Sequence, residues 1–103
     1  MRMLLRVTVD VEAGNAAIKN NTLQQLMQSR LQELKPEAAY FFPDHGKRTA
    51  YIFFDLKETS QIPSIAEPFF QTLNATVELI PVMNANDLRT GLEQVGRMQR
   101  VAS

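Results

Sequence analysis

Residues 38–54 read AAYFFPDHGKRTAYIFF, and this stretch decides the fold. Two runs of aromatic and β-branched residues flank the cluster Pro43-Asp44-His45-Gly46, whose residue types favour tight turns. Strands are rich in the first kind of residue and are bounded by the second, so the stretch predicts a β-hairpin. His45 then lies near the hairpin tip, where solvent reaches it.

The residues before the hairpin predict a strand followed by a helical region. Side chains alternate from Met3 to Asp10 with the period of a half-buried strand. Beyond Gly14, the sequence Thr22-x-x-Gln25 resembles a capping box, and Pro36 prevents the helix from continuing. The Asn20-Asn21-Thr22 segment can divide this region into two helices. The expected core-facing stripe comprises Leu23, Leu26, Met27, Leu31 and Leu34.

The residues after the hairpin predict a second helix, a fourth strand and a terminal helix. Ser60 is the expected N-cap of the second helix, and Pro68 is expected to kink it or end it early. Residues 76–83 alternate as a strand, and Pro81 places that strand at a sheet edge. Asn84-x-x-Asp87 then caps a terminal helix. The apolar stripe of the second helix comprises Ile62, Ile65, Ala66, Phe69, Phe70 and Leu73.

The order strand, helix, strand, strand, helix, strand predicts a single α+β domain over residues 1–103 with the split βαβ, or ferredoxin-like, arrangement. Its right-handed crossovers place both helices on one face of a four-stranded antiparallel sheet, so the other face is open. Apolar patches of this size are uncommon on monomers, so we expect a second copy to cover the open face in a homodimer. The terminal helix folded over this face is the alternative. The expected open-face residues are Leu4, Arg6, Thr8, Thr49, Tyr51, Phe53, Glu78 and Ile80.

Composition argues against several classes of function. Eleven Lys and Arg residues balance eleven Asp and Glu residues, so no net charge attracts nucleic acid or anionic lipid. The chain has no cysteine and one histidine, so we expect no metal site and no cofactor. No apolar run reaches the length of a signal-peptide core or of a membrane span. The expected location is therefore the cytoplasm, without membrane contact.

The element order, ending in VELIPVMNANDL over residues 77–88, resembles the dimeric α+β barrel superfamily. That superfamily includes muconolactone isomerase-like proteins, antibiotic biosynthesis monooxygenase-like proteins and, closest to this chain, small bacterial proteins of unknown function. The resemblance covers nearly the whole chain and implies a dimer whose two sheets pack face to face, with ligands in a pocket bounded by sheet and helices. It implies no reaction, because the fold hosts many functions and this chain lacks the tryptophan of the cofactor-free monooxygenases.

Arg6 and Glu78 are the leading site candidates, since both are expected on the open face and on neighbouring strands. One interpretation is a cross-strand ion pair or dimer contact; the other is a ligand site in which Arg6 holds a carboxylate or enolate and Glu78 moves a proton. Tyr40 and Tyr51 are able to donate hydrogen bonds to such a ligand or to supply buried area at a wet rim. His45 is the side chain whose ordinary pKa lies nearest neutrality, and it completes the candidate set.

An RNA-binding module with the same strand order is a rival interpretation. Residues 47–54 overlap its recognition pattern at several positions. Arg48 stands where that pattern has a glycine, and Thr49 stands where it has its first stacking aromatic residue. We therefore expect no binding to nucleic acid.

Two hypotheses remain. The first is a homodimeric barrel that binds or transforms a small organic acid or aromatic metabolite without a metal. The second is a non-catalytic dimerisation or regulatory module in which Arg6 and Glu78 pair with each other. A cavity lined by Arg6, Tyr51 and Glu78 would favour the first hypothesis, and a closely packed face would favour the second.

Overall fold

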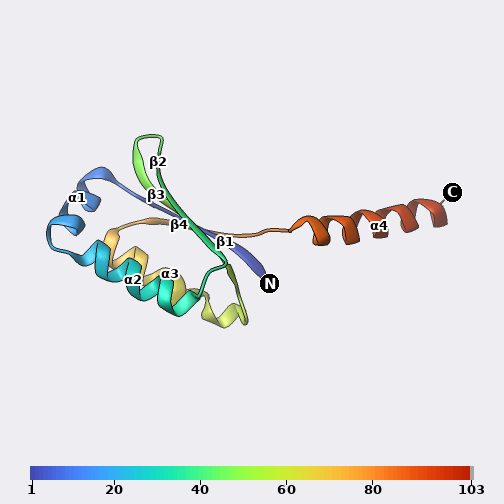
Figure 1. Ribbon diagram of the computed structural model, residues 1–103, viewed down its shortest axis with the longest axis horizontal. Helices are drawn as coiled ribbons and strands as arrows, with labels where there is room; N and C mark the ends of the chain where they lie inside the picture. The colour runs from blue at the N-terminus through green and yellow to red at the C-terminus, as the bar shows by residue number, and fades with distance from the viewer. Residues whose placement is uncertain (103) are drawn as a thin grey trace.

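Strand and helix patterns alternate along the chain, and the computed structural model, which describes residues 1–102, shows where each begins and ends (Figure 1). The elements are β1 (Arg2–Val9), α1 (Val11–Lys19), α2 (Thr22–Leu34), β2 (Ala38–Asp44), β3 (Lys47–Asp55), the 3-10 turn η1 (Thr59–Gln61), α3 (Ile62–Leu73), β4 (Thr76–Pro81) and α4 (Ala85–Ala102). The fold class is therefore α+β, as the sequence predicts.

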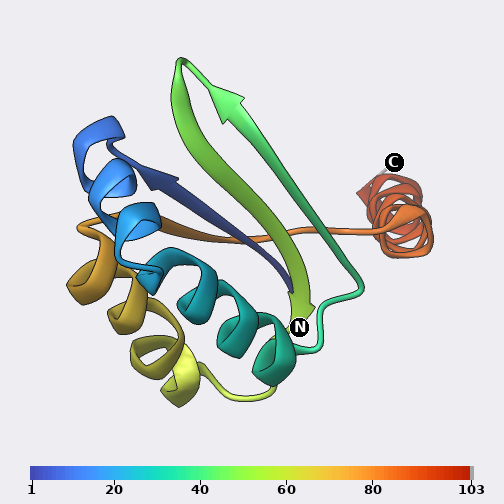
Figure 2. The same ribbon diagram turned by 60° about the vertical axis from the view of Figure 1, so that its left-hand side comes forward.

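The four strands form one antiparallel sheet in the order β2-β3-β1-β4. Helices α1, α2 and α3 lie together on one side of this sheet (Figure 2). Alternation along β1 points Leu5 and Val7 toward the helices, where they are 0% and 1% exposed. β4 lies at an edge, so Pro81 removes no ladder hydrogen bond from the interior of the sheet.

The core lies between the sheet and these three helices. Its largest fully buried side chains are Phe69, Leu5, Ile52, Leu73 and Val7. Burying each contributes about 1.5 to 3 kcal/mol relative to leaving it in water. The alternating residues of β1 and β3, together with Phe69 and Leu73 of α3, supply these side chains. Phe70 belongs to the predicted apolar stripe of this helix but is 42% exposed, so its place in the stripe is wrong.

The helical region after β1 divides into two helices at Asn20 and Asn21, where the sequence allows such a break. Asn21 adopts a left-handed conformation with φ of 67°, which an asparagine tolerates. The Asn20 Oδ1 atom accepts hydrogen bonds from the Thr22 backbone N at 3.0 Å and the Thr22 Oγ1 at 2.6 Å. The Thr22 hydroxyl is thus used by Asn20, and the predicted capping box with Gln25 is wrong.

The start of α3 also differs from the prediction. Ser60 lies inside η1 rather than capping a helix, because Gln61 Oε1 accepts the Glu58 backbone N–H at 3.0 Å and closes a 3-10 turn first. α3 then begins at Ile62 with Pro63 in its first turn, where a proline leaves no hydrogen bond unmade.

Pro68 does not end α3, which continues to Leu73. A proline inside a helix deprives the carbonyl four residues earlier of its donor, and here that carbonyl belongs to Ser64. Arg30 on α2 supplies a replacement, since its Nη1 donates to the Ser64 oxygen at 3.4 Å. The predicted early end of this helix is therefore wrong, because a side chain from another helix replaces the lost donor.

The terminal helix α4 extends away from the sheet and the other helices, and the molecule is 62 Å along its longest axis (Figures 1 and 2). Asn84 and Asp87 cap it reciprocally: Asp87 N donates to Asn84 Oδ1 at 2.8 Å, and Asn84 N donates to Asp87 Oδ2 at 3.0 Å. The cap is as predicted, but the alternative in which this helix covers the open face is not formed. Within residues 1–102, no helix combines the length and the apolar character needed to cross a lipid bilayer.

Candidate functional site

Arg6 lies at the centre of the open face, opposite Tyr51 on β3 and Glu78 on β4. Its Nε donates to Glu78 Oε1 and its Nη2 donates to Glu78 Oε2, both at 2.9 Å. The remaining Nη1 lies 3.4 Å from the Tyr51 hydroxyl oxygen. The register thus brings together three of the five residues that the sequence nominated.

The two charges of this pair stabilise each other. The Glu78 carboxylate raises the pKa of Arg6, and the Arg6 guanidinium lowers the pKa of Glu78. Glu78 is consequently ionised at neutral pH and already accepts two hydrogen bonds, which is the opposite of the raised pKa that a neutral-pH proton donor needs. The geometry corresponds to the cross-strand ion pair weighed above.

Aromatic residues of β2 and β3 lie on one side of the pair. The Phe42 and Tyr51 rings meet edge to face, with their centroids 4.8 Å apart. Tyr40 lies opposite Tyr51 in the register and is 62% exposed. The open face thus carries an ion pair with aromatic side chains beside it.

His45 stands apart from this cluster. It occupies the two-residue hairpin turn with φ of 52°, followed by Gly46 with φ of 77°, a turn type that needs two positive φ angles. Its side chain is 93% exposed and faces Asp44, with Nδ1 and Oδ1 3.1 Å apart. It lies five residues from Tyr40 along the chain, about 16 Å of extended strand. The structure therefore does not bring His45 to the Arg6 cluster.

Two residues expected on the bare surface are buried. Leu4 is 8% exposed because it lies between Phe53 and Ile80 in the register. Thr49 is 4% exposed, and its Oγ1 donates to the Lys47 carbonyl at 3.0 Å. The half-buried aromatic and aliphatic side chains around Leu4 therefore supply the apolar surface that the open face exposes to solvent.

The apolar cavity of the domain lies on the helix side of the sheet, between α1, α2 and the β2–β3 hairpin. It has a volume of about 410 Å³. The buried residues Val7, Val9 and Ala50 form its floor, and the exposed side chains of Ile18 and Phe41 form part of its rim. Its full lining is Val7, Val9, Ile18, Leu23, Met27, Phe41, Phe42, Pro43, Arg48, Thr49 and Ala50.

Arg48 is the one charged residue in this lining. Its Nη2 donates to Asn15 Oδ1 at 3.0 Å, and its Nη1 lies 3.5 Å from the Val11 carbonyl oxygen. Arg48 was not among the residues predicted from the sequence, although it begins the helix-facing row that continues with Ala50, Ile52 and Phe54. A charged residue at the start of an otherwise apolar row is the sequence pattern that indicates this site.

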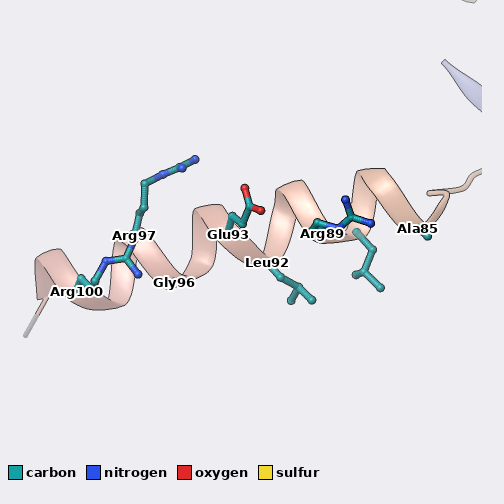
Figure 3. A pocket seen from close by; sticks show the side chains of 8 residues that line it. Ala85, Arg89, Leu92, Glu93, Gly96, Arg97 and Arg100 are labelled. Carbon is teal, nitrogen blue, oxygen red and sulfur yellow. The ribbon is translucent and has the colours of Figure 1, made fainter.

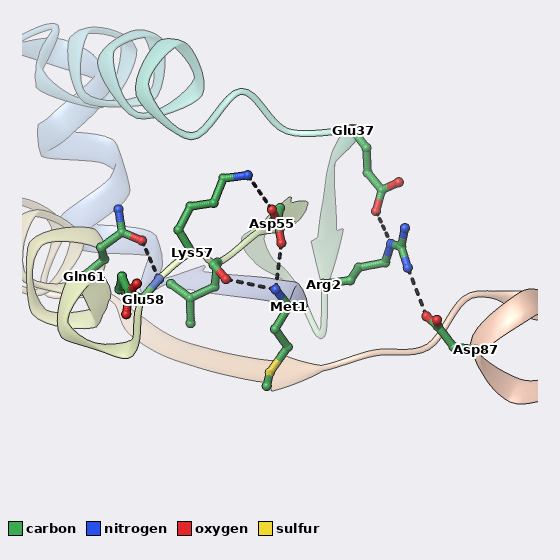
Figure 4. A network of polar contacts seen from close by, with 9 residues as sticks. Met1, Arg2, Glu37, Asp55, Lys57, Glu58, Gln61 and Asp87 are labelled. Carbon is green, nitrogen blue, oxygen red and sulfur yellow. Dashed lines mark hydrogen bonds and ion pairs between the residues drawn. The ribbon is translucent and has the colours of Figure 1, made fainter. Parts of the chain in front are cut away.

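The surface at the base of α4 is a network of paired charges (Figure 4). Arg2 bridges Glu37 and Asp87, at 2.8 and 3.1 Å. Asp55 binds Lys57 and the Met1 ammonium group, each at 2.7 Å, and these contacts lower the pKa of Asp55 to about 2. Each charge in these ion pairs is satisfied by a neighbour, which is typical of a structural network.

The surface hollow along α4 is not enclosed by other elements. Figure 3 shows Arg89, Glu93 and Arg97 projecting from a single helix, and every residue lining this hollow belongs to α4. One helix cannot enclose a ligand. Across residues 1–102, no three histidine, aspartate or glutamate side chains gather closely enough to hold a metal ion.

No family model matches this sequence, and no curated protein matches it. The functional proposal below therefore rests on the geometry of the two faces of the sheet.

Proposed function

We propose that this chain is a homodimeric, ferredoxin-like domain that binds a small organic molecule, with two copies packed sheet to sheet as in dimeric α+β barrels. The observation that carries the proposal is the asymmetry of the sheet. Three helices cover one face, and the other presents aromatic side chains beside a paired charge.

The charge pair makes face-to-face packing physically reasonable. Burying an unpaired arginine or glutamate would be costly, but Arg6 and Glu78 neutralise each other within one copy. Tyr51, Phe53 and Ile80 then offer half-buried apolar area to the same residues of a second copy. Such a self-complementary contact closes with twofold symmetry and leaves no further face exposed.

The cavity on the helix side supports the binding of a small molecule. Its volume of about 410 Å³ falls within the usual size of ligand pockets, and its lining is largely apolar. In this arrangement Arg6, Tyr51, Tyr40 and Glu78 contact the partner copy, and the ligand lies on the opposite face. The ligand is a small organic acid or an aromatic metabolite held without a metal.

Sedimentation velocity at 10 to 50 μM tests the dimer. We expect the wild type to sediment as a dimer and Phe53→Asp to sediment as a monomer, because the substitution puts two like charges into the contact. Phe70→Asp is the matched control, since Phe70 lies on α3 and is 42% exposed. A monomeric wild type, or equal effects of the two substitutions, would refute the proposal.

A non-catalytic dimerisation module is the second candidate. The bidentate pair of Arg6 and Glu78 favours it, because both groups are already satisfied and neither is offered to a ligand. A thermal-shift screen against small acids and aromatic compounds separates the two functions. Stabilisation of the dimer by members of this panel supports ligand binding, and a dimer that none of them stabilises supports the module.

A further inference from the structure

We propose that the cavity selects a monocarboxylate with an apolar body, and that Arg48 is the residue that recognises the carboxylate. This inference rests on the small-molecule binding proposed above and names the class of ligand and the residue that anchors it.

The first observation is the charge of Arg48. Its two hydrogen-bond acceptors, the Asn15 amide oxygen and the Val11 carbonyl, are both neutral. Among the described residues Arg48 makes no ion pair, and Asp10, the acidic residue that follows β1, is bound by Lys47 at 3.0 Å. A guanidinium group carries five N–H donors and prefers carboxylates, which it binds through two parallel hydrogen bonds. The wall of the cavity thus holds an uncompensated positive charge with donors to spare.

The second observation is the position of Gly14. A Cβ atom placed on Gly14 would lie 2.6 Å from Arg48 Nη1 and 3.3 Å from its Cδ. The Arg48 side chain therefore crosses α1 at a point that only glycine leaves open. Glycine within a helix is unfavourable relative to alanine, and Gly14 has an ordinary helical backbone, so the passage of Arg48 is the physical reason we find for it.

The rest of the cavity defines the ligand body. Leu23 and Met27 of α2 form an apolar wall, and Ile18 and Phe41 are 40% and 53% exposed at the rim. An aromatic or medium-chain aliphatic group in the cavity would cover these side chains, and each covered methylene favours binding. Because the lining holds one cation, the cavity suits a single carboxylate better than a diacid or a phosphate ester.

The test compares matched ligands by isothermal titration calorimetry at pH 7. The probes are naphthalene-2-carboxylate with naphthalene-2-carboxamide, and octanoate with octanamide. We expect each acid to bind about 10- to 100-fold more tightly than its amide, since a charge-assisted hydrogen bond is worth that ratio. Added salt should weaken the acids alone.

Variants of the anchor separate recognition from folding. Arg48→Met should bind acid and amide equally while retaining affinity for the amide. Lys57→Met is the matched control, because it removes a positive charge that is bound to Asp55 and lies outside the cavity lining, so it should keep the preference for the acid. Gly14→Ala displaces the guanidinium and should reduce the preference several-fold, while thermal stability stays equal or rises, because alanine favours the helix.

The outcomes are distinct. Equal binding of acid and amide by the wild type overturns the role of Arg48 and leaves the cavity as an apolar site. Binding of neither probe overturns this inference and the proposed ligand function together. The dimer lies on the other face, so sedimentation reports on it independently of either result.

Discussion

Arg6 and Glu78 face each other across adjacent strands and share two parallel hydrogen bonds, each 2.9 Å long. The pair lies at the middle of the face through which we propose that two copies meet. Its protonation state therefore links pH to the stability of the domain and, if two copies meet as proposed, to that of the dimer.

The first prediction concerns acid. The Arg6 guanidinium holds the pKa of Glu78 below its ordinary value of 4.5 in the folded chain. The stability that this pair supplies is therefore fully present above pH 4.5 and is lost as pH falls through the lowered pKa. We expect urea unfolding between pH 3 and 7 to show a smaller acid loss in Glu78→Gln than in the wild type.

The control for this prediction is Glu67→Gln, which removes a carboxylate on α3 that accepts a hydrogen bond from Gln71. It should follow the wild-type pH profile. Wild-type and Glu78→Gln curves that run parallel through the acid range would contradict the role assigned to the pair.

The second prediction concerns the core. Phe69 is 0% exposed and Phe70 is 42% exposed, although they are neighbours on α3. Phe69→Ala should lower the free energy of unfolding by about 3 to 5 kcal/mol, because it leaves a cavity as well as losing apolar burial. Phe70→Ala should cost no more than about 1 kcal/mol. Equal losses in chemical denaturation would show that the face of α3 is misassigned.

The positions of the strands and most of the buried stripe on α3, with the exception of Phe70, could be predicted because they depend on local periodicity. Alternation along β1 and the three- and four-residue spacing along α3 reflect which side chains meet the core. The shielding of Leu4 and Thr49 could not be predicted in this way. It depends on which side chains the sheet register places beside them.

For the candidate sites, too, one part could be predicted from the sequence and another part could not. The meeting of Arg6 and Glu78 followed from the expected strand order, since neighbouring strands align residues of one face. The cavity did not follow, because its size depends on how α1 and α2 pack against the hairpin. Only the charge of Arg48 at the start of an apolar row pointed to it from the sequence.

The third prediction tests the contact that lets α3 pass Pro68. If Arg30 replaces the missing donor to the Ser64 carbonyl, Arg30→Met should lower the free energy of unfolding by about 1 kcal/mol. In a Pro68→Ala background the backbone N–H of residue 68 is available to that carbonyl, so most of this loss should disappear. A double-mutant cycle measures the coupling. If the effects of the two substitutions simply add, Arg30 does not compensate for Pro68, and the explanation for the uninterrupted helix is wrong.

The fourth prediction is that the domain folds without α4. Among the residues whose burial the structure describes, none of the buried core residues belongs to α4, and the contacts of this helix with the domain include the exposed ion pair between Asp87 and Arg2. Such pairs contribute at most about 1 kcal/mol, so a chain ending at Asn84 should retain cooperative unfolding within about 1 kcal/mol of the full chain. Leu73→Ala, which truncates a side chain 1% exposed, should cost about 2 to 5 kcal/mol in either chain. Thermal unfolding followed by circular dichroism makes both comparisons, and a truncated chain without a cooperative transition would show that α4 is part of the folding unit.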